Sequence, residues 1–372
     1  MNFDFPEELR ELREQARRFL RDRCPLDRAR RVLEGSEPYD RALWQEVAEM
    51  GWTGAAVPDE YGGPGLGHLG VCVLAEELGY ALAPIPFASS VYLATEAILA
   101  FGSKAQKERY LPKLAAGELI GTLALAERPG AVDPRRLVTE ASGGRISGAK
   151  IAVPDGDVAD IAVVGVRGSP SLYLVDLHGA GVERTPVETF DPSRSHARIA
   201  FNAAPAEPLA EGEAGDQIRR LLDRAAIMMA FEQVGGAQAA LDMARDYALQ
   251  RYAFGRPIGS FQAIKHKLAD VYVAVELARS NAYYGAYALS KDAPELPVAA
   301  ALARISASEA GWLATKENIQ THGGMGFTWG FDCHLHYRRA KLLSLALGGA
   351  REWKRRLIAE LRTRNVAEFA SG

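Results

Sequence analysis

Two segments in the C-terminal third of the chain carry residues suited to binding a diphosphate. The first contains Arg251, Phe254, Gly255 and Gln262, and it places an arginine at a predicted helix end just before a glycine turn. The planar guanidinium of arginine presents a fork of N–H donors that matches a diphosphate. The pattern predicts an anion-binding turn, although an arginine beside a turn is more often only a surface charge.

The second segment runs from Gln320 to Phe327 and contains Gly323, Gly324 and Gly326. Three glycines in four residues after a helix let backbone N–H groups approach an anion without interference from Cβ atoms. The simpler interpretation is a helix C-terminus capped by glycine. Neither segment is specific alone, so the argument depends on finding both, in this order, in one chain.

The elements that must position these segments fall into three regions. Residues 1–118 show helical spacing of apolar side chains, with a helix stop at Gly51, a non-helical loop at 58–65 and a single helical stretch from Ser89 to Leu111. Residues 119–214 contain short β-branched runs separated by turns, which is typical of a small antiparallel β domain. Residues 215–372 return to long helices, predicted at 218–250, 261–289 and 296–319, joined by short loops. We expect an α+β multidomain fold: an N-terminal helical domain, a middle β domain and a C-terminal four-helix bundle.

Bulk composition narrows the functional classes. The chain has 372 residues, of which 48% are apolar and 24% charged, and its net charge is −3, so it offers no electrostatic argument for nucleic acid. It contains no apolar run long enough for a membrane span and no secretory signal. Cys24, Cys72 and Cys333 form no disulfide or metal pattern, which is typical of a reducing, cytoplasmic environment.

Together the two C-terminal segments resemble the flavin-binding motifs of the acyl-CoA dehydrogenase family. The N-terminal half resembles the same family in several runs: 44–52, 58–63, 76–79, 102–112 and 117–118. The resemblance implies FAD at a subunit interface, an acyl-CoA thioester substrate and α,β-desaturation with hydride transfer to the flavin. It also implies an electron-transfer flavoprotein-type acceptor. The cofactor-binding residues implied are Arg251, Phe254, Gly255, Gln262, Gln320, Gly323 and Gly324.

The resemblance fails at the catalytic base. In the family a glutamate sits in the last helix, before a Gly-Thr pair and nine residues after an arginine that matches Arg338; here that position is Leu347, followed by Gly348. Some members carry the base on the long helix before Arg251, and the matching position here is Ala225. Neither position has a carboxylate, so the catalytic residue is not identified.

Residues that would contact the flavin ring are also replaced. The family's Thr-Glu-Pro-x-x-Gly-Ser-Asp loop matches residues 126–133 here, with Ala126 and Val132 in place of hydroxyl side chains. The family's Trp-x-Thr becomes Ala152-Val-Pro154. The retained residues serve a neighbour's FAD in the family, whereas the replaced ones serve the subunit's own ring. The chain therefore resembles the base-lacking subunit of heterotetrameric, steroid-type acyl-CoA dehydrogenases, which needs a glutamate-bearing homologous partner.

Two other hypotheses remain open. One is a homo-oligomeric dehydrogenase with a relocated base, for which Asp223 and Glu232 lie on the correct helix. Asp223 is two positions from the expected site, a rotation of about 200°, so we interpret both as surface charges. The other is a non-catalytic flavin- or thioester-binding protein. We predict no metal site, because His334 and His336 at i,i+2 spacing on a helix point apart.

Overall fold

The computed structural model describes residues 6–130, 132–168, 172–209 and 214–370. By contacts the chain divides into two compact units. Unit 1 contains residues 1–30, 72–83 and 226–372, and unit 2 contains residues 31–71 and 84–225. The domain boundaries predicted at 118 and 214 stay predictions, because a division by contacts can join segments that are distant in sequence.

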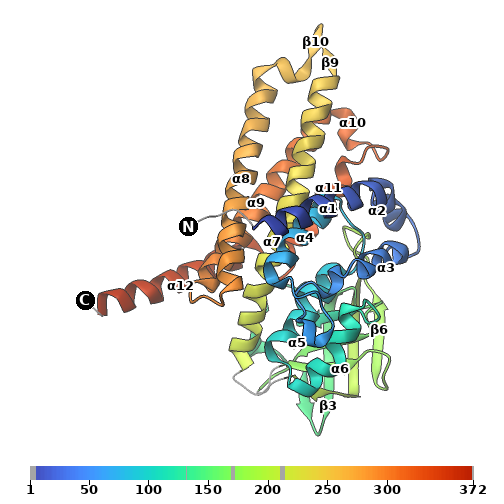
Figure 1. Cartoon of the computed structure of the whole chain (residues 1–372), viewed down its shortest axis with the longest axis vertical. Coiled ribbons are helices and arrows are strands. Elements are labelled where there is room, and N and C mark those ends of the chain that lie inside the picture. The colour runs from blue at the N-terminus through green and yellow to red at the C-terminus, as the bar shows by residue number, and fades with distance from the viewer. Residues whose placement is uncertain (1–5, 131, 169–171, 210–213, 371–372) are drawn as a thin grey trace. The chain divides into compact units, whose positions relative to one another are not determined.

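Unit 1 is helical. Figure 1 shows α7 and α8 running side by side, with the short hairpin β9–β10 at their common end. Its helices are α1 (Glu7–Arg23), the later part of α7 (Ala214–Gln250), α8 (Gln262–Ser290), α9 (Leu296–His322), α10 (Gly324–Phe327), α11 (Cys333–Leu345) and α12 (Ala350–Ala370), with part of α4 (Gly67–Tyr80). The predicted C-terminal helical bundle is confirmed.

Small apolar side chains explain why the long helices pack closely. α8 buries Val271, Val275, Ala278 and Ala282 at helical spacing of three and four residues. About half of the buried residues of α9 are alanine or glycine, which allows its backbone to approach its neighbours. α9 begins with Pro297 in its first turn, where a missing N–H costs nothing.

Two glycines set the crossing of α4 with α7. A Cβ on Gly79 would lie 2.0 Å from the carbonyl oxygen of Glu232, and a Cβ on Gly235 would lie 1.9 Å from that of Glu76. Each helix therefore needs a glycine where the other helix's backbone passes. This explains the glycine in the Glu76–Gly79 run, which sequence alone assigned only by resemblance.

The helical part of unit 2 agrees with most of the predicted pattern. Its elements are part of α2 (Leu26–Glu34), α3 (Arg41–Glu49), the 3-10 turns η1 (Trp52–Gly54) and η2 (Asp59–Tyr61), the π-helix η3 (Ala88–Thr95), α5 (Glu96–Phe101) and α6 (Lys104–Ala115). Gly51 adopts positive φ after α3, as predicted. The single helical stretch expected from Ser89 to Leu111 is wrong: the chain breaks at Gly102, and Ser103 starts α6 with a capping box.

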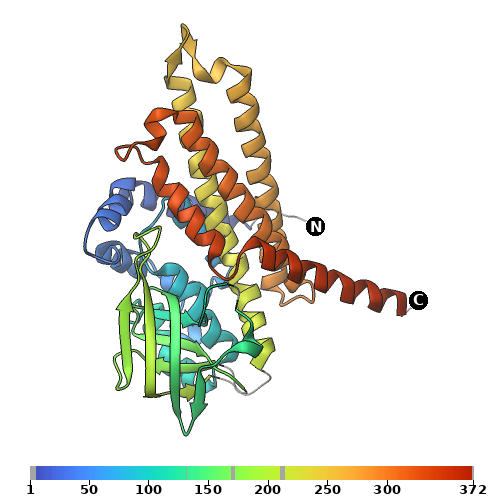
Figure 2. The same cartoon turned by 180° about the vertical axis from the view of Figure 1, so that it is seen from behind.

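Unit 2 also holds two four-stranded sheets, drawn in green in Figure 2. One has the order β1 (Gly121–Ala124), β4 (Ile161–Gly165), β5 (Leu172–Asp176), β8 (Glu207–Pro208); the other has β2 (Glu140–Ser142), β3 (Arg145–Pro154), β7 (His196–Pro205), β6 (Val182–Pro186). The predicted antiparallel β domain is confirmed with one exception, because β1 pairs with β4 in parallel. The hydroxyl of Thr122 donates to the carbonyl of Pro154 at 2.5 Å and links the sheets.

Within the described ranges, every helix is too short or too polar to cross a bilayer.

Candidate functional site

The first predicted segment forms a hairpin that continues directly from α7. β9 (Tyr252–Ala253) and β10 (Arg256–Pro257) are joined by Phe254 and Gly255, which have φ values of +52° and +79°. A two-residue turn with both φ values positive matches the right-handed twist of a β ribbon. Phe254 is unusual there, because a bulky L-residue disfavours this conformation and its side chain is 95% exposed. A strained and exposed aromatic ring at a hairpin tip is suited to contact with another molecule.

Several contacts make this hairpin a rigid projection. The guanidinium of Arg256 lies 4.0 Å from the centre of the Phe261 ring, and Phe254 meets the same ring edge-on at 6.2 Å. The N–H of Ile258 donates to the carbonyl of Arg251 at 2.8 Å and closes the base of the hairpin. Arg251 itself is exposed. Its charge is therefore open to an incoming anion.

Gln262 is the first residue of α8 and is exposed. The Nε2 atom of His266 lies 2.9 Å from the side-chain oxygen of Gln262. His266 is exposed too.

The second predicted segment is a turn between α9 and α10. Gly323 has φ +61° and ψ −137°, a backbone conformation that residues other than glycine avoid. A Cβ built on Gly323 or Gly324 would meet nothing within 4 Å, whereas one on Gly326 would lie 2.5 Å from the carbonyl oxygen of Ile319. Gly326 is therefore needed for packing, while Gly323 and Gly324 leave their backbone open to solvent. Gln320, one turn earlier, is also exposed.

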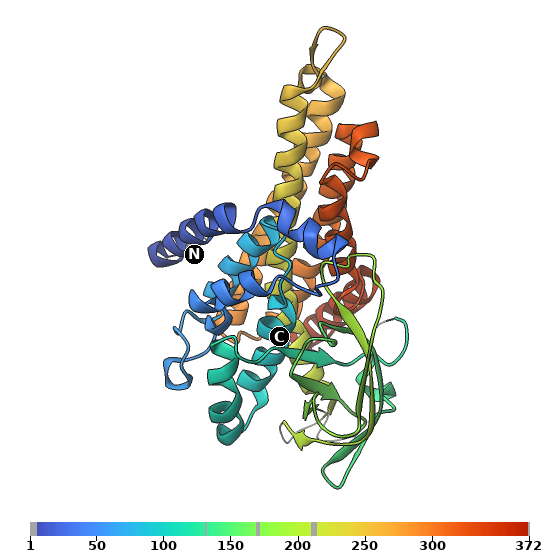
Figure 3. The ribbon, with the colours of Figure 1, turned by 90° about the vertical axis from the view of Figure 1, so that its right-hand side faces the viewer.

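The two segments are held at the same end of the helices of unit 1 (Figure 3). The ring of Tyr247, four residues before Arg251, stacks on His322 with centroids 4.0 Å apart. Nζ of Lys267 on α8 lies 3.2 Å from Oε2 of Glu317 on α9. The structure thus joins the helix ends from which both segments continue. Their outward-facing groups form an open surface, which is suited to a ligand presented from outside rather than enclosed.

The expected base positions lie on two different elements. The prediction that position 347 lies in the last helix is wrong. Helix α11 ends at Leu345 and α12 begins at Ala350, so Leu347 lies between them. Leu347 has a φ of +59°, and the following residue, Gly348, has a φ of +97°. Ala225 lies within α7 and is fully buried.

The interpretation of Asp223 and Glu232 as surface charges is wrong. Asp223 is 4% exposed and Glu232 is 1% exposed. Oε1 of Glu232 lies 3.7 Å from a guanidinium nitrogen of Arg339 on α11, itself buried. A helix that is buried on several sides gives no clear polar face, so the sequence pattern could not distinguish a solvated carboxylate from an internal one.

In unit 2, the loop after β1 contains a buried ion pair. This is the loop in which Ala126 and Val132 replace the family's hydroxyl side chains. Lys150 is 0% exposed, and its Nζ donates to Oε1 of Glu127 at 2.8 Å. Burial alone would raise the pKa of Glu127, but hydrogen bonds from Lys150, Thr139 and Val138 lower it to about 2. Glu127 therefore anchors the loop to Lys150, Thr139 and Val138. Ala152 lies in an irregular part of β3 with φ +47°, and residue 131 is outside the described ranges.

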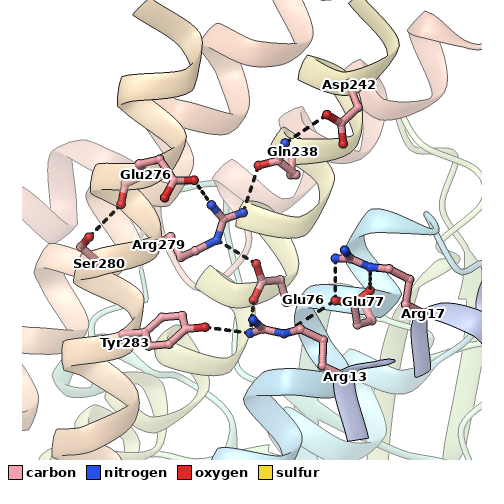
Figure 4. Close-up of polar contacts among 10 residues, drawn as sticks. All are labelled: Arg13, Arg17, Glu76, Glu77, Gln238, Asp242, Glu276, Arg279, Ser280 and Tyr283. Carbon is pink, nitrogen blue, oxygen red and sulfur yellow. Dashed lines mark hydrogen bonds and ion pairs between the residues drawn. The ribbon is translucent and has the colours of Figure 1, made fainter. Parts of the chain in front are cut away.

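A polar network that the sequence analysis missed joins four helices of unit 1 (Figure 4). Arg13 on α1 donates to Oε2 of Glu76 at 2.9 Å and to the hydroxyl of Tyr283 at 2.8 Å, and Arg279 donates to Oε1 of Glu76 at 3.0 Å. Arg17 makes a two-pronged contact with Glu77, both bonds 2.9 Å. The signal available in the sequence was the adjacent acid pair before Gly79, because acids inside an apolar run require cationic partners.

Comparison with known proteins shows the same architecture along the whole chain. The family model for the acyl-CoA dehydrogenase N-terminal domain matches residues 6–118, and that for the C-terminal domain matches residues 215–361. Acyl-CoA dehydrogenase IpdE2 of Mycobacterium tuberculosis is 34% identical, covering 96% of this chain and 98% of the relative.

Two solved structures are similar in sequence as well as in fold. A variant of the steroid acyl-CoA dehydrogenase Tcur3481–Tcur3483 is 32% identical with a TM-score of 0.88, covering 98% of this chain and 99% of that one. The ChsE4–ChsE5 complex from Mycobacterium tuberculosis is 28% identical with a TM-score of 0.89, covering 97% of this chain and 99% of that one.

Fold and matches together define an FAD-dependent oxidoreductase class acting on CH–CH bonds. The chain belongs to the acyl-CoA dehydrogenase family. The exposed guanidinium of Arg251 and the exposed backbone at Gly324 are of the kind that a diphosphate of FAD requires, whereas the N–H of Gly323 donates to the carbonyl of Gln320 at 3.1 Å. The residues present therefore fit the outer part of the cofactor.

Proposed function

We propose that this chain is the subunit of a heteromeric acyl-CoA dehydrogenase that completes its partner's FAD site and lacks the catalytic base. The observation that carries the proposal is Leu347, a leucine in left-handed conformation beside Gly348, at the position where the family holds a glutamate. Loss of a general base costs about 10²–10⁴-fold in rate. A glutamate-bearing homologous partner would supply this group.

The chain's own role is to bind and orient the cofactor. Bound FAD accepts the hydride in the α,β-desaturation of an acyl-CoA thioester. Arg251 would contact the diphosphate, and the backbone at Gly324 would face the same anion, with Gly323 allowing the turn that exposes it. The exposed ring of Phe254 and the side chains of Gln262 and Gln320 would complete the contact, with Gly255 allowing the turn.

The similarity to chains from two-component enzymes supports a paired assembly. Both solved structures described above are named for two components, and one of them is a steroid acyl-CoA dehydrogenase. We extend the steroid-type substrate, and an electron-transfer flavoprotein-type acceptor, to this chain as part of the proposal.

A relocated base is less well supported. Glu232 is buried, and its carboxylate lies against the guanidinium of Arg339. A base must reach the proton that it removes. Glu232 is 1% exposed and lies against Arg339, so its carboxylate is not open to a substrate proton.

Co-expression with homologous glutamate-bearing subunits tests the proposal. The chain purified alone should contain little flavin and show no acyl-CoA-dependent dye reduction, whereas the pair should bind FAD and turn over. In the pair, Arg251→Ala and Gln320→Ala should each lower FAD occupancy at least tenfold. Arg245→Ala changes an exposed arginine near the end of α7 and is the matched control. This variant should keep the FAD occupancy of the unmodified pair. Stoichiometric FAD with ordinary turnover in the isolated chain would refute the proposal.

A further inference from the structure

Arg304 on α9 is a buried cation at the junction of three helices. It is 1% exposed. One guanidinium nitrogen donates to the side-chain oxygen of Gln233 on α7, and the other terminal nitrogen donates to the carbonyl oxygens of Leu343 and, at 2.5 Å, of Ala346. These two carbonyls belong to the last turn of α11 and to the residue after it. Arg304 therefore binds the end of α11 where its chain leaves the helix.

This contact fixes the backbone on which Leu347 sits. The last carbonyls of a helix have no partner within the helix, and a cation there also interacts favourably with the helix dipole. Arg304 satisfies two of them directly before Leu347 and Gly348, both of which have positive φ. The N–H of Gly348 donates to the carbonyl of Leu345 at 3.2 Å and closes the turn.

The charge of Arg304 has no direct ion-pair partner among the described residues. Burial lowers its pKa to about 9, opposed by the charge of Glu232, so it remains protonated at neutral pH. Its hydrogen-bond acceptors are an amide and two carbonyls. Glu232 on α7 and His336 and Arg339 on α11 line the same small cavity as Gln233 and Leu343, and Glu232 lies 3.7 Å from Arg339. On α12, Glu352 lies beside the connection, with its Cβ and Cγ 3.9 Å from a Cβ built on Gly348. The positive charge of Arg304 lies directly against the carbonyls at the end of α11.

A buried charge that is bonded only to neutral groups carries a large desolvation penalty, so stability alone does not favour it. We propose that Arg304 is a positioning residue that keeps the connection Ala346–Gly349 in the geometry and positive field of a carboxylate site, although this chain has leucine at position 347. The inference rests on the proposed function only in taking position 347 as the family's base position.

Hydrogen exchange measured by mass spectrometry tests the positioning role in the full-length chain. Arg304→Met should increase amide exchange at least tenfold in peptides covering residues 343–353, and Arg304→Lys should restore part of the protection. Arg279→Met removes another largely buried guanidinium, in the network of Figure 4, and should leave these peptides unchanged. Unchanged exchange in Arg304→Met, or an equal increase in Arg279→Met, would overturn the inference.

A second measurement tests the field and does not depend on Arg304→Met folding. In Leu347→Glu, labelled with ¹³C-glutamate, the midpoint of the new carboxylate titration should lie about one pH unit lower than in Leu347→Glu with Arg304→Gln, because an opposite charge within about 6 Å lowers a carboxyl pKa by one unit or more. Equal midpoints, or the reverse order, would contradict the proposed field. Neither measurement needs FAD or a partner subunit, so their outcome is separate from that of the co-expression test.

Discussion

Lys150 and Glu127 form a buried ion pair, 2.8 Å between Nζ and Oε1, that links the loop after β1 to β3. Breaking such a pair leaves one uncompensated charge inside the protein and costs about 3–5 kcal/mol. Lys150→Met should therefore lower the free energy of unfolding by about this amount in urea titrations. Lys150→Met combined with Glu127→Gln should recover much of the loss. If the double variant is no more stable than the single one, the ion pair does not explain the effect.

A second buried carboxylate makes stability sensitive to acid. Burial alone would raise the pKa of Glu96, but His68, whose Nε2 lies 2.9 Å from Oε2, and Arg224 lower it to about 2. A carboxyl whose pKa is lower in the folded state contributes its stability above pH 4.5 and loses it as pH falls from about 4.5 to 2.

Glu96→Gln should therefore reduce the fall in unfolding free energy between pH 5 and pH 3. The reduction is about 2 kcal/mol, because only part of the effect of the lowered pKa falls within this pH window. Glu60→Gln changes an exposed carboxylate and serves as the control. Urea unfolding at several pH values measures both. Identical pH profiles for Glu96→Gln and the unmodified chain would exclude this account.

Phe254→Gly should separate stability from function. The left-handed conformation costs a non-glycine residue about 1–2 kcal/mol, while glycine adds about 0.5–1 kcal/mol of chain entropy to the unfolded state. We expect a small rise in the thermal midpoint of the isolated chain, about 1–2 °C, together with loss of FAD from the assembled pair. A lowered midpoint would show that the exposed ring stabilises the hairpin itself.

The α4–α7 crossing provides a matched pair of substitutions. Gly235→Ala would place Cβ 1.9 Å from the carbonyl oxygen of Glu76, whereas Gly236→Ala would place it 3.5 Å from that of Gly79. Gly235→Ala should cost about 2–3 kcal/mol or more through overpacking. Gly236→Ala should be neutral or gain up to about 1 kcal/mol from helix propensity. Chemical denaturation compares the two, and similar losses would argue against this geometry.

Helical spacing and β-branched runs predicted most elements because they are local properties of the sequence. The limits of α7, α8 and α9 agree with the pattern to within a few residues. Long-range pairing was not accessible in this way, so the parallel pair of β1 with β4 was missed. The break at Gly102 was missed because apolar spacing continues through it, although Ser103 followed by Gln106 is a recognisable capping signal.

Some residues of the candidate site could be predicted from the sequence and others could not. Arg251, Gly323 and their neighbours could be named from residue type and order, and the structure places them on one open end of unit 1; their contacts with FAD stay a prediction. The burial of Glu232 and the role of Arg304 depend on which helices meet, which no local pattern encodes. For such residues a charge in a predicted core helix is the only warning that the sequence offers.

Leucine at position 347 has a further consequence for the evolution of the chain. An enzyme that must keep an ionisable group poised in an apolar setting sacrifices some stability for activity. If the proposed function holds, this subunit does not lose stability to a catalytic carboxylate, because the carboxylate belongs to its partner. Robustness and reactivity could then evolve on separate polypeptides, one tolerant of change at its former reaction centre and the other constrained there.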